Sequence, residues 1–356
     1  MSKRRLLCPA FVDLHVHFRD PGFTDKEDIE TGGQAAAAGG FRAVCCMPNT
    51  NPAIDSPDTL MYIDEKARRL SPVAIFAVGA LTKGQAGKEL ADIEAMHDAP
   101  TLCRELTGHG ICAISEDGRS LYDEDLMRQA LLLAKKLNIP LMDHPEPEPE
   151  IVRRDIGLAR ETGARIHLQH ISTAEAVDAV RQAKKEGVSI TAETCPHYFA
   201  LTKEAEKKFG ANAKMNPPLG TERDRIAVTE ALCDGTIDVI ATDHAPHEAA
   251  LKRLPFAEAP FGIIGLETAF PVSYTVLVKG GYMTAEDLIK LMSTNPAKII
   301  GLRSGVGISA GVTGDTGDVT VDLASTYLID SSKFRSKARN TPFEGMEVTG
   351  EIIHDR

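Results

Sequence analysis

The chain has 356 residues, of which 43% are hydrophobic, so it is long enough for one large domain or two modest ones. Its formal net charge of −11 at pH 7 argues against a nucleic-acid-binding protein and against an anionic-membrane binder, since both need a basic surface. Seven cysteines without the spacing of a small disulfide scaffold favour reduced thiols in a cytoplasmic enzyme. Pro9 and Asp13 interrupt the first apolar stretch, so we expect neither a signal peptide nor a membrane span.

Apolar, strand-like segments alternate with helix-like segments along most of the chain. We expect strands at 11–16, 41–47, 73–78, 111–114, 139–142, 165–168, 188–192 and 237–241. We expect helices at about 26–38, 58–70, 85–98, 123–137, 150–162, 173–186, 221–234, 267–279 and 284–294. Short continuous apolar runs are typical of parallel strands that are covered on both faces.

This alternation predicts an α/β fold, a (β/α)8 TIM barrel, with a doubly wound sheet as the alternative. We place the barrel in residues 8–302. Residues 303–356, which are rich in Gly, Thr, Asp and Val at their start, are expected to form a small strand-and-loop appendage. Residues 1–7 are expected to join it, so that the termini make a remnant β appendage and not a second full domain.

The first predicted strand runs into a His-x-His pair. Residues two apart in a strand point to the same face, so His15 and His17 make a bidentate platform for a metal such as zinc. The pair by itself is a weak signal, because two histidines near a surface strand are also compatible with no function at all.

Further candidate ligands follow later strands. Asp117 comes after the fourth strand, His144 after the fifth, His170 after the sixth and Asp243 after the eighth. Active sites of (β/α)8 barrels lie at the carboxyl ends of the strands, so these side chains and the His-x-His pair are expected to converge. Imidazole and carboxylate groups suit Zn²⁺, and a two-metal site needs a bridging anion, for which Asp117 is the candidate. The pattern predicts a hydrolytic site with one or two Zn²⁺ ions.

The remaining histidines are given structural interpretations. His97, His109 and His354 are expected to be ordinary surface residues. His167 is expected to face the helix layer. His197, which follows the seventh strand, is left open between a structural role and a supporting role near the site.

Longer motifs point to one family. They occupy residues 13–19, 20–22, 47–50, 215–219, 241–247 and 259–262. With them the chain, from about residue 8 to residue 302, resembles the amidohydrolase superfamily and, within it, the bacterial dihydroorotases. The His-x-His pair marks only the superfamily. The combination of Met-Pro-Asn-Thr, Asn-Pro-Pro-Leu and Asp-His-Ala-Pro-His is much more specific.

The resemblance implies reversible cyclisation of N-carbamoyl-L-aspartate to L-dihydroorotate, a step of pyrimidine biosynthesis, by a metal-bridged hydroxide. It implies that His15, His17 and Asp243 hold one metal, and that His144 and His170 hold the second. Asp243 would also serve as the catalytic base and acid.

The resemblance also implies a bridge and a set of substrate contacts. Many family members bridge the metals with a carboxylated lysine, whereas this chain resembles the branch that uses an aspartate, here Asp117, with Glu116 as the fallback. The implied substrate-binding residues are Arg19, Asn49, Asn216, His247, Pro260 and Gly262. Asn49 and Asn216 could instead be turn residues beside prolines. Residues 248–258 are either a mobile flap or a solvated surface helix.

Three features depart from the family pattern. The chain begins almost at the barrel, so we expect its tail to lack most of the usual pairing partner and to expose open edge strands. Residues 145–150 form a short, extended link where the family commonly has a longer loop, and Gly220 stands where an arginine is common. These departures suggest a chain that is trimmed at the N-terminus and after the fifth strand, engineered, or incompletely recorded.

Two other functions stay open. A hydantoinase or allantoinase would apply the same chemistry to another cyclic amide, but the motifs favour dihydroorotase. A weakly active scaffold subunit would be typical of a chain without the metal ligands, and all six are present. We expect a small-molecule substrate and a homodimer, and leave open an association with another pyrimidine-pathway enzyme.

Overall fold

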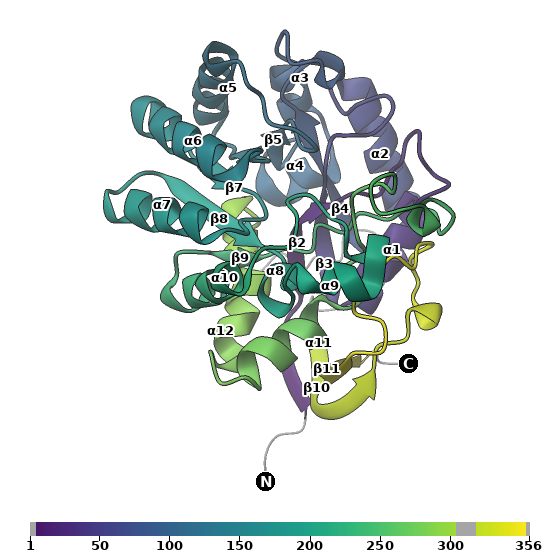
Figure 1. Cartoon of the computed structure of the whole chain (residues 1–356). Coiled ribbons are helices and arrows are strands. Elements are labelled where there is room, and N and C mark those ends of the chain that lie inside the picture. The colour runs from purple at the N-terminus through teal and green to yellow at the C-terminus, as the bar shows by residue number, and fades with distance from the viewer. Residues whose placement is uncertain (1–4, 304–317, 354–356) are drawn as a thin grey trace.

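The computed structural model describes residues 5–303 and 318–353. Eight parallel strands form one sheet in chain order, and helices surround it (Figure 1). The strands are β2 (Phe11–Val16), β3 (Phe41–Cys46), β4 (Ala74–Ala80), β5 (Ala113–Ser115), β6 (Leu141–Asp143), β7 (Ile166–Leu168), β8 (Ile190–Thr194) and β9 (Val239–Ile240). A parallel bridge between Val16 and His244 joins the last strand region to the first. The predicted (β/α)8 barrel is confirmed.

The helices mostly match the predicted segments. They are α1 (Ile29–Ala38), α2 (Pro57–Leu70), α3 (Ile93–Asp98), α4 (Leu102–Thr107), α5 (Glu124–Leu137), α6 (Glu148–Thr162), α7 (Ala174–Lys185), α8 (Pro196–Ala200), α9 (Glu204–Phe209), α10 (Glu222–Asp234), α11 (Ala269–Ser273), α12 (Ala285–Ile289) and α13 (Asn295–Ile299). Each of α11 and α12 continues into a π-helical turn, which completes the segments predicted at 267–279 and 284–294. Among the described residues, none of the helices combines the length and apolar character needed to cross a membrane.

The region after β4 differs from the prediction. A single helix at 85–98 was expected, but the chain makes a 3-10 turn at Lys83–Gln85 and the short helix α3. Gly84 and Gly87 both have positive φ, so a continuous right-handed helix cannot pass through them. The following stretch, which lies outside the helices expected from the sequence, contains α4, which begins at a Thr101 side-chain cap.

Two layers of apolar side chains hold the barrel. Val12, Leu14 and Phe76 belong to an inner cluster, whereas Phe11 and Phe41 belong to the larger cluster between strands and helices. The large aromatic and aliphatic side chains of both clusters are almost fully buried. Burying a side chain of this kind stabilises a fold by about 1.5–3 kcal/mol.

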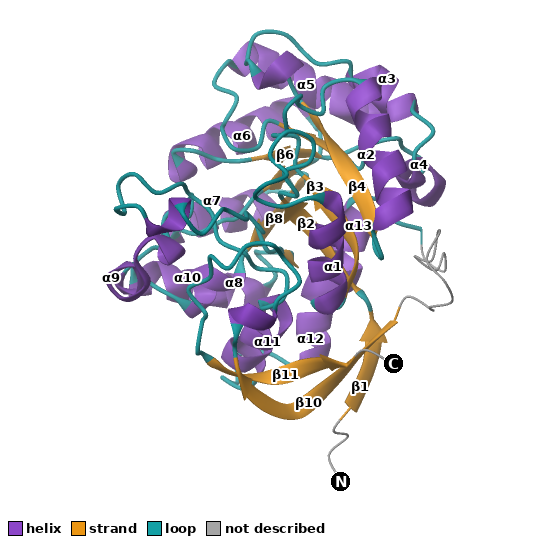
Figure 2. Ribbon diagram, turned by 90° about the vertical axis from the view of Figure 1, so that its right-hand side faces the viewer, coloured by secondary structure: helices purple, strands orange, loops and turns teal. Residues whose placement is uncertain are grey.

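A second, three-stranded antiparallel sheet is built from both ends of the chain (Figure 2). Its order is β1 (Arg5–Pro9), β10 (Asp318–Leu328) and β11 (Glu347–Ile353). The expected appendage therefore exists: the short β1 is the N-terminal partner of β10, which pairs on both sides, and β1 and β11 form the two edges of the sheet. The parts of the appendage at residues 1–4, 304–317 and 354–356, including His354, lie outside the described residues.

Candidate metal centre and substrate pocket

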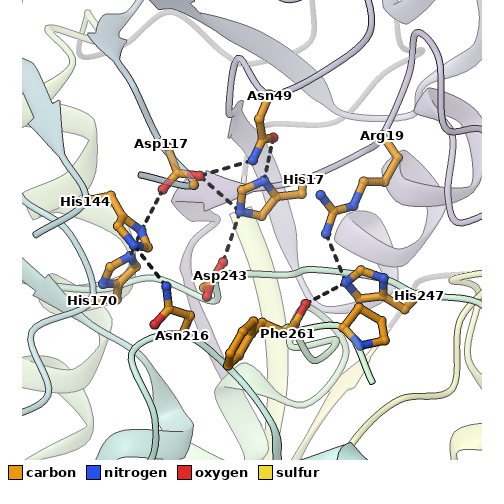
Figure 3. Close-up of a pocket in the computed structure, with 13 residues that line it drawn as sticks. His17, Arg19, Asn49, Asp117, His144, His170, Asn216, Asp243, His247 and Phe261 are labelled. Carbon is orange, nitrogen blue, oxygen red and sulfur yellow. Dashed lines mark hydrogen bonds and ion pairs between the residues drawn. The ribbon is translucent and has the colours of Figure 1, made fainter. Parts of the chain in front are cut away.

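The six predicted metal ligands meet at the carboxyl ends of the strands, and all of them except His15 are labelled in Figure 3. They form two groups that share Asp117: one with His15 and His17, the other with His144 and His170, and the ligand atoms within each group lie within 4.8 Å of one another. Asp243 joins the first group, because its Oδ1 lies 3.1 Å from His17 Nε2 and 3.6 Å from His15 Nε2.

Asp117 stands between the two groups, as a bridging ligand would. Its Oδ1 lies 3.2 Å from His15 Nε2 and 3.4 Å from His144 Nδ1, and its Oδ2 lies 3.5 Å from His17 Nε2. The fallback, Glu116, points elsewhere, since its carboxylate accepts hydrogen bonds from the backbone N–H and the hydroxyl of Thr82.

The unsatisfied atoms of this cluster test whether a metal fits. Within the described part of the chain, His15 Nε2, Asp117 Oδ1 and His170 Nδ1 are buried without a hydrogen-bond partner. Buried polar atoms are normally paired, so orphaned atoms in one cluster need another partner. Here His15 Nε2 faces Asp117 Oδ1 at 3.2 Å without hydrogen-bond geometry. Converging lone pairs of imidazole nitrogen and carboxylate oxygen suit a cation, and this donor set fits a transition-metal ion.

The charges of the cluster are strongly coupled. Burial alone would raise the pKa of Asp117, but His15 and His144 outweigh it and hold that pKa well below its usual range. The pKa of Asp243 is likewise lowered, because His15 and His17 outweigh its burial. Burial, followed by repulsion from His144 and His15, lowers the pKa of His170 to about 3. The pKa values of His15 and His144 are instead raised, because the neighbouring Asp117 outweighs their burial, so the carboxylates and His170, but not His15 and His144, are already in the protonation states that metal ligation requires.

Several predicted site residues adopt unusual backbone conformations. Arg19, His170 and Asp243 have φ values of 63°, 37° and 47° although none is glycine. Such left-handed conformations cost on the order of 1–3 kcal/mol each and cluster at functional sites, where packing enforces them. The orientation of these three side chains is thus maintained at a cost in the stability of the barrel.

A buried carboxylate behind His15 was missed by the sequence analysis. Glu193, on β8, is fully buried, and its Oε1 lies 2.8 Å from His15 Nδ1 while its Oε2 lies 3.1 Å from His167 Nε2. The expectation that His167 faces the helices is wrong: its neighbours Ile166 and Leu168 face that layer, so His167 points into the barrel. A carboxylate on the second nitrogen of a metal-ligating histidine fixes its tautomer and orientation.

His197 follows β8, at the start of α8. Its ring is buried, and among the described residues its Nε2 has no hydrogen-bond partner. Burial lowers the pKa of His197 to about 4, and Asp243 opposes this shift. The ring is therefore neutral and within the electrostatic reach of the site, and its supporting role stays a prediction.

A cavity of about 350 Å³ opens beside the metal-ligand cluster. All six predicted substrate-binding residues line it, namely Arg19, Asn49, Asn216, His247, Pro260 and Gly262. The interpretation of Asn49 and Asn216 as mere turn residues is not supported, because both side chains reach the cluster. Asn49 Oδ1 lies 2.9 Å from His17 Nδ1, and Asn216 Nδ2 lies 3.3 Å from His144 Nε2.

The far side of this cavity is cationic. Arg19 Nη2 lies 3.5 Å from His247 Nε2. His247 Nε2 in turn lies 2.6 Å from the carbonyl oxygen of Phe261. The shorter contact identifies Nε2–H as the donor, so the ring is neutral. Burial and the neighbouring Arg19 lower the pKa of His247 to about 3, in agreement with that state. The guanidinium of Arg19 is suited to bind a carboxylate, whereas the single N–H of the neutral His247 ring is already donated to Phe261.

Comparison with protein families matches residues 6–354 to the amidohydrolase family. The chain belongs to the amidohydrolase family. It is 42% identical to a protein from Acetivibrio thermocellus named dihydroorotase, over 99% of this chain and 86% of that protein. It is 41% identical to a dihydroorotase from Clostridioides difficile, over 98% of this chain and 85% of that protein.

Solved structures show the same fold at lower identity. An L-hydantoinase (dihydropyrimidinase) from Arthrobacter aurescens superposes with a TM-score of 0.86 at 23% identity, covering 98% of this chain and 83% of that chain. A dihydroorotase from Saccharomyces cerevisiae, in complex with 5-fluoroorotic acid, gives a TM-score of 0.79 at 16% identity, covering 98% of each chain. The barrel of this amidohydrolase is thus shared by proteins that are named for different activities.

In this amidohydrolase, two lysines anchor the loop that carries Pro260 and Gly262. Lys252 Nζ donates to the carbonyl oxygens of Lys214, Pro260 and Gly262 at 3.3, 3.0 and 2.8 Å. Lys214 Nζ donates to the carbonyl oxygens of residues 256, 257 and 259. Residues 248–258 contain a three-residue 3-10 turn and no solvated helix, so that interpretation is wrong, while the mobility of the segment stays a prediction.

The C-terminal segment of the amidohydrolase also reaches the pocket. Asn340 is buried, and it lies in the segment that connects β10 to β11. Its Oδ1 accepts a hydrogen bond from His247 N at 3.3 Å, and its Nδ2 donates to the carbonyl oxygens of Ala245 at 3.2 Å and Gly262 at 3.0 Å. The sequence analysis missed this residue, because nothing near it in the chain indicates a contact almost a hundred positions away.

Proposed function

We propose that this amidohydrolase is a dihydroorotase, which interconverts N-carbamoyl-L-aspartate and L-dihydroorotate. One observation carries the assignment: a cluster of four histidines and two aspartates shares a cavity with the cationic corner of Arg19 and His247. A hydrolytic centre next to a carboxylate-binding corner matches a cyclic amide that bears an acid. The names of the relatives at 42% and 41% identity support the same substrate.

We propose Zn²⁺ as the metal, with His15, His17 and Asp243 holding one ion and His144 and His170 the second. The two ligand groups that share Asp117 support this division. When bound, the ions supply Lewis acidity that polarises the scissile carbonyl and activates a water. Glu193 keeps His15 in one tautomer, since its carboxylate accepts the Nδ1–H.

The protein side chains then have separate tasks. Arg19 binds the substrate carboxylate, with His247 beside it, and Asn216 contacts the ring amide edge. In ring opening, Asp243 accepts a proton from the attacking water and delivers it to the leaving ring nitrogen. In ring closure, the same carboxyl protonates the departing oxygen. The low pKa of Asp243 keeps it ionised and ready to accept the proton.

The test is an assay of dihydroorotate ring opening with the zinc-loaded protein, together with elemental analysis of bound metal. We expect turnover and one or two Zn²⁺ ions per chain. A fully loaded protein that does not turn over dihydroorotate would overturn the assignment. Faster turnover of hydantoin or allantoin would replace it with the other cyclic-amide hydrolases, and a chain that binds no metal would favour the scaffold role.

We also propose the division into a barrel, residues 8–302, and an appendage, residues 303–356 with 1–7. The separate antiparallel sheet supports it. We further propose a homodimer, for which β1 and β11 offer sheet edges. Light scattering of the intact protein tests the dimer, and a monomer at all concentrations would exclude it.

A further inference from the structure

A second cavity lies against the loop that carries Pro260 and Gly262, which we call the substrate loop. This cavity measures about 150 Å³ and is lined by Asn212, Ala249, Lys252, Arg253, Arg339 and Asn340. Two of these residues, Lys252 and Asn340, also hold the carbonyl oxygen of Gly262, which lines the substrate pocket. The two cavities therefore share a wall.

The residues that line the second cavity carry positive charge, and the carboxylate of Glu267, outside that lining, interacts electrostatically with Arg339. The lining contains three cationic side chains and no carboxylate, in a chain whose formal net charge is −11. Lys252 is only 8% exposed, and within the described residues no carboxylate oxygen lies within 4.0 Å of its ammonium group. Its three N–H groups all donate to the carbonyl oxygens of Lys214, Pro260 and Gly262, so Lys252 brings a positive charge to the wall of the cavity but no free donor.

The two arginines still have N–H groups to offer. In the described part of the chain, the Arg253 guanidinium makes no hydrogen bond or ion pair. Arg339 donates from Nη1 to the carbonyl oxygens of Ser336 and Ala338, and from Nη2 to that of Phe334. A guanidinium has five N–H donors, so Arg339 keeps two. Planar guanidinium forks match the oxygens of a phosphate group.

We propose that this second cavity binds a phosphate group and that the bound anion tightens the substrate loop. Three positive charges favour a dianion over a single carboxylate. The volume corresponds to about five water molecules at ~30 Å³ each, which leaves room for one tetrahedral anion. The group is either free phosphate or the phosphate of a nucleotide whose remaining atoms lie outside the cavity.

A bound anion acts on the substrate pocket through the wall that the two cavities share. An anion held by Arg253 and Arg339 lies close to Lys252 and favours its charged form, and a charged lysine donates more strongly to the carbonyls of Pro260 and Gly262. Asn340 connects the same wall to His247. Binding of phosphate in the second cavity is therefore expected to lower KM for dihydroorotate. This second consequence rests on the proposed function, whereas the binding itself does not.

The first experiment measures binding alone. Sodium phosphate is titrated into metal-loaded protein by calorimetry at constant ionic strength. All variants carry Arg19→Gln, which removes the anion-binding corner of the substrate pocket. We expect Arg253→Gln to weaken phosphate binding about 10-fold or more, the loss of one charge-assisted hydrogen bond. Arg223→Gln, an exposed arginine on α10, is the matched control and should bind as tightly as its parent. Equal binding by the Arg253→Gln variant, or no binding by its parent, overturns the proposal.

Two further measurements complete the test. Nucleoside monophosphates that bind tighter than inorganic phosphate would identify a nucleotide as the ligand, whereas equal or weaker binding would identify free phosphate; either result supports the site. In kinetics with otherwise native protein, phosphate should lower KM about 5-fold, and Arg253→Gln should abolish that response without changing the basal rate. An unchanged response in Arg253→Gln overturns the coupling. A protein that binds phosphate in the second cavity but never turns over dihydroorotate would refute the proposed function and leave the phosphate site supported.

Discussion

The two ends of the active-site cavity are built in different ways. At the metal end, the ligands sit on the last residues of strands or directly after them, and their backbone is fixed by the barrel ladder. At the substrate end, His247, Pro260 and Gly262 sit on loops, which are held by Lys252 and by Asn340 from the C-terminal segment. The metal end is positioned by the barrel strands. The substrate end is positioned by hydrogen bonds from the side chains of Lys252 and Asn340, which we call struts.

This difference separates chemistry from recognition. Changes at the strand ends should act on kcat or on metal binding. Changes to the struts should act on KM, because they loosen the loop that meets the substrate and leave the cluster of metal ligands intact. Each of the following variants tests one side of this division.

The largest effect is expected for Asp243→Asn. Asparagine removes the proton acceptor and weakens a metal ligand, so kcat should fall by about 10²–10⁴-fold from lost acid-base catalysis alone. Steady-state kinetics with measured metal content separate the two losses. Asp178→Asn, an exposed acid on α7, is the matched control. A variant with full metal content and near-normal kcat would remove Asp243 from the reaction.

Arg19→Gln should come next. The guanidinium that we assign to the substrate carboxylate would be lost, so KM should rise by about 10- to 100-fold while kcat changes little. Kinetics across a wide range of dihydroorotate concentrations provide the measurement. If KM is untouched, Arg19 does not hold the carboxylate.

Glu193→Gln tests the hydrogen bond that supports His15 at the metal end of the cavity. The variant keeps the shape but weakens the hydrogen bond from His15 Nδ1, so metal affinity should fall by about 10- to 100-fold. Competition with a chelator measures the affinity. Glu175→Gln, exposed on α7, controls for loss of one negative charge. Unchanged metal affinity would reduce Glu193 to a packing residue.

Asn340→Ser tests the strut from the C-terminal segment. It deletes the hydrogen bonds to His247, Ala245 and Gly262, so KM should rise about 10-fold while kcat and metal content stay near normal. Asn340→Asp keeps the acceptor for His247 N, so its KM should lie between those of the unsubstituted protein and the Asn340→Ser variant. A parallel fall in kcat and metal content would contradict the division between the two ends.

The smallest effect concerns pH. Burial, with a contribution from Lys214, lowers the pKa of Lys252 from 10.5 to about 8. The unfolded chain then binds more protons than the folded one between about pH 8 and 10.5, so this group makes stability rise with pH across that window. Lys252→Met should remove that contribution in denaturant unfolding at pH 8 and pH 10. Lys66→Met is the control, because the pKa of Lys66 is raised, and the rise should persist.

Local sequence signals explain which parts of the molecule were predictable. His15, His17, His144, His170 and Asp243 were found because each follows an apolar run that could only be a strand, and barrel topology brings strand ends together. His167 was assigned to the wrong face because a strand of three residues gives too little alternation to fix its phase.

The supports of the site could not be predicted in this way. Glu193 was detectable in principle, as an acid directly after the strand predicted at 188–192. Lys214, Lys252 and Asn340 bond to backbone carbonyls, and a carbonyl leaves no trace in the sequence of the residue that provides it. Where recognition depends on such bonds, the substrate end of a pocket is harder to predict than its metal end.

The position of Asn340 has a consequence for the chain during its synthesis. Every proposed metal ligand has left the ribosome about a hundred residues before Asn340 does, so these ligands are all synthesised while the wall around Gly262 still lacks its hydrogen bond from Asn340. Translation that stops after α13 would therefore release a product that has every proposed metal ligand yet lacks this hydrogen bond. Near-complete translation is thus a condition for a finished pocket.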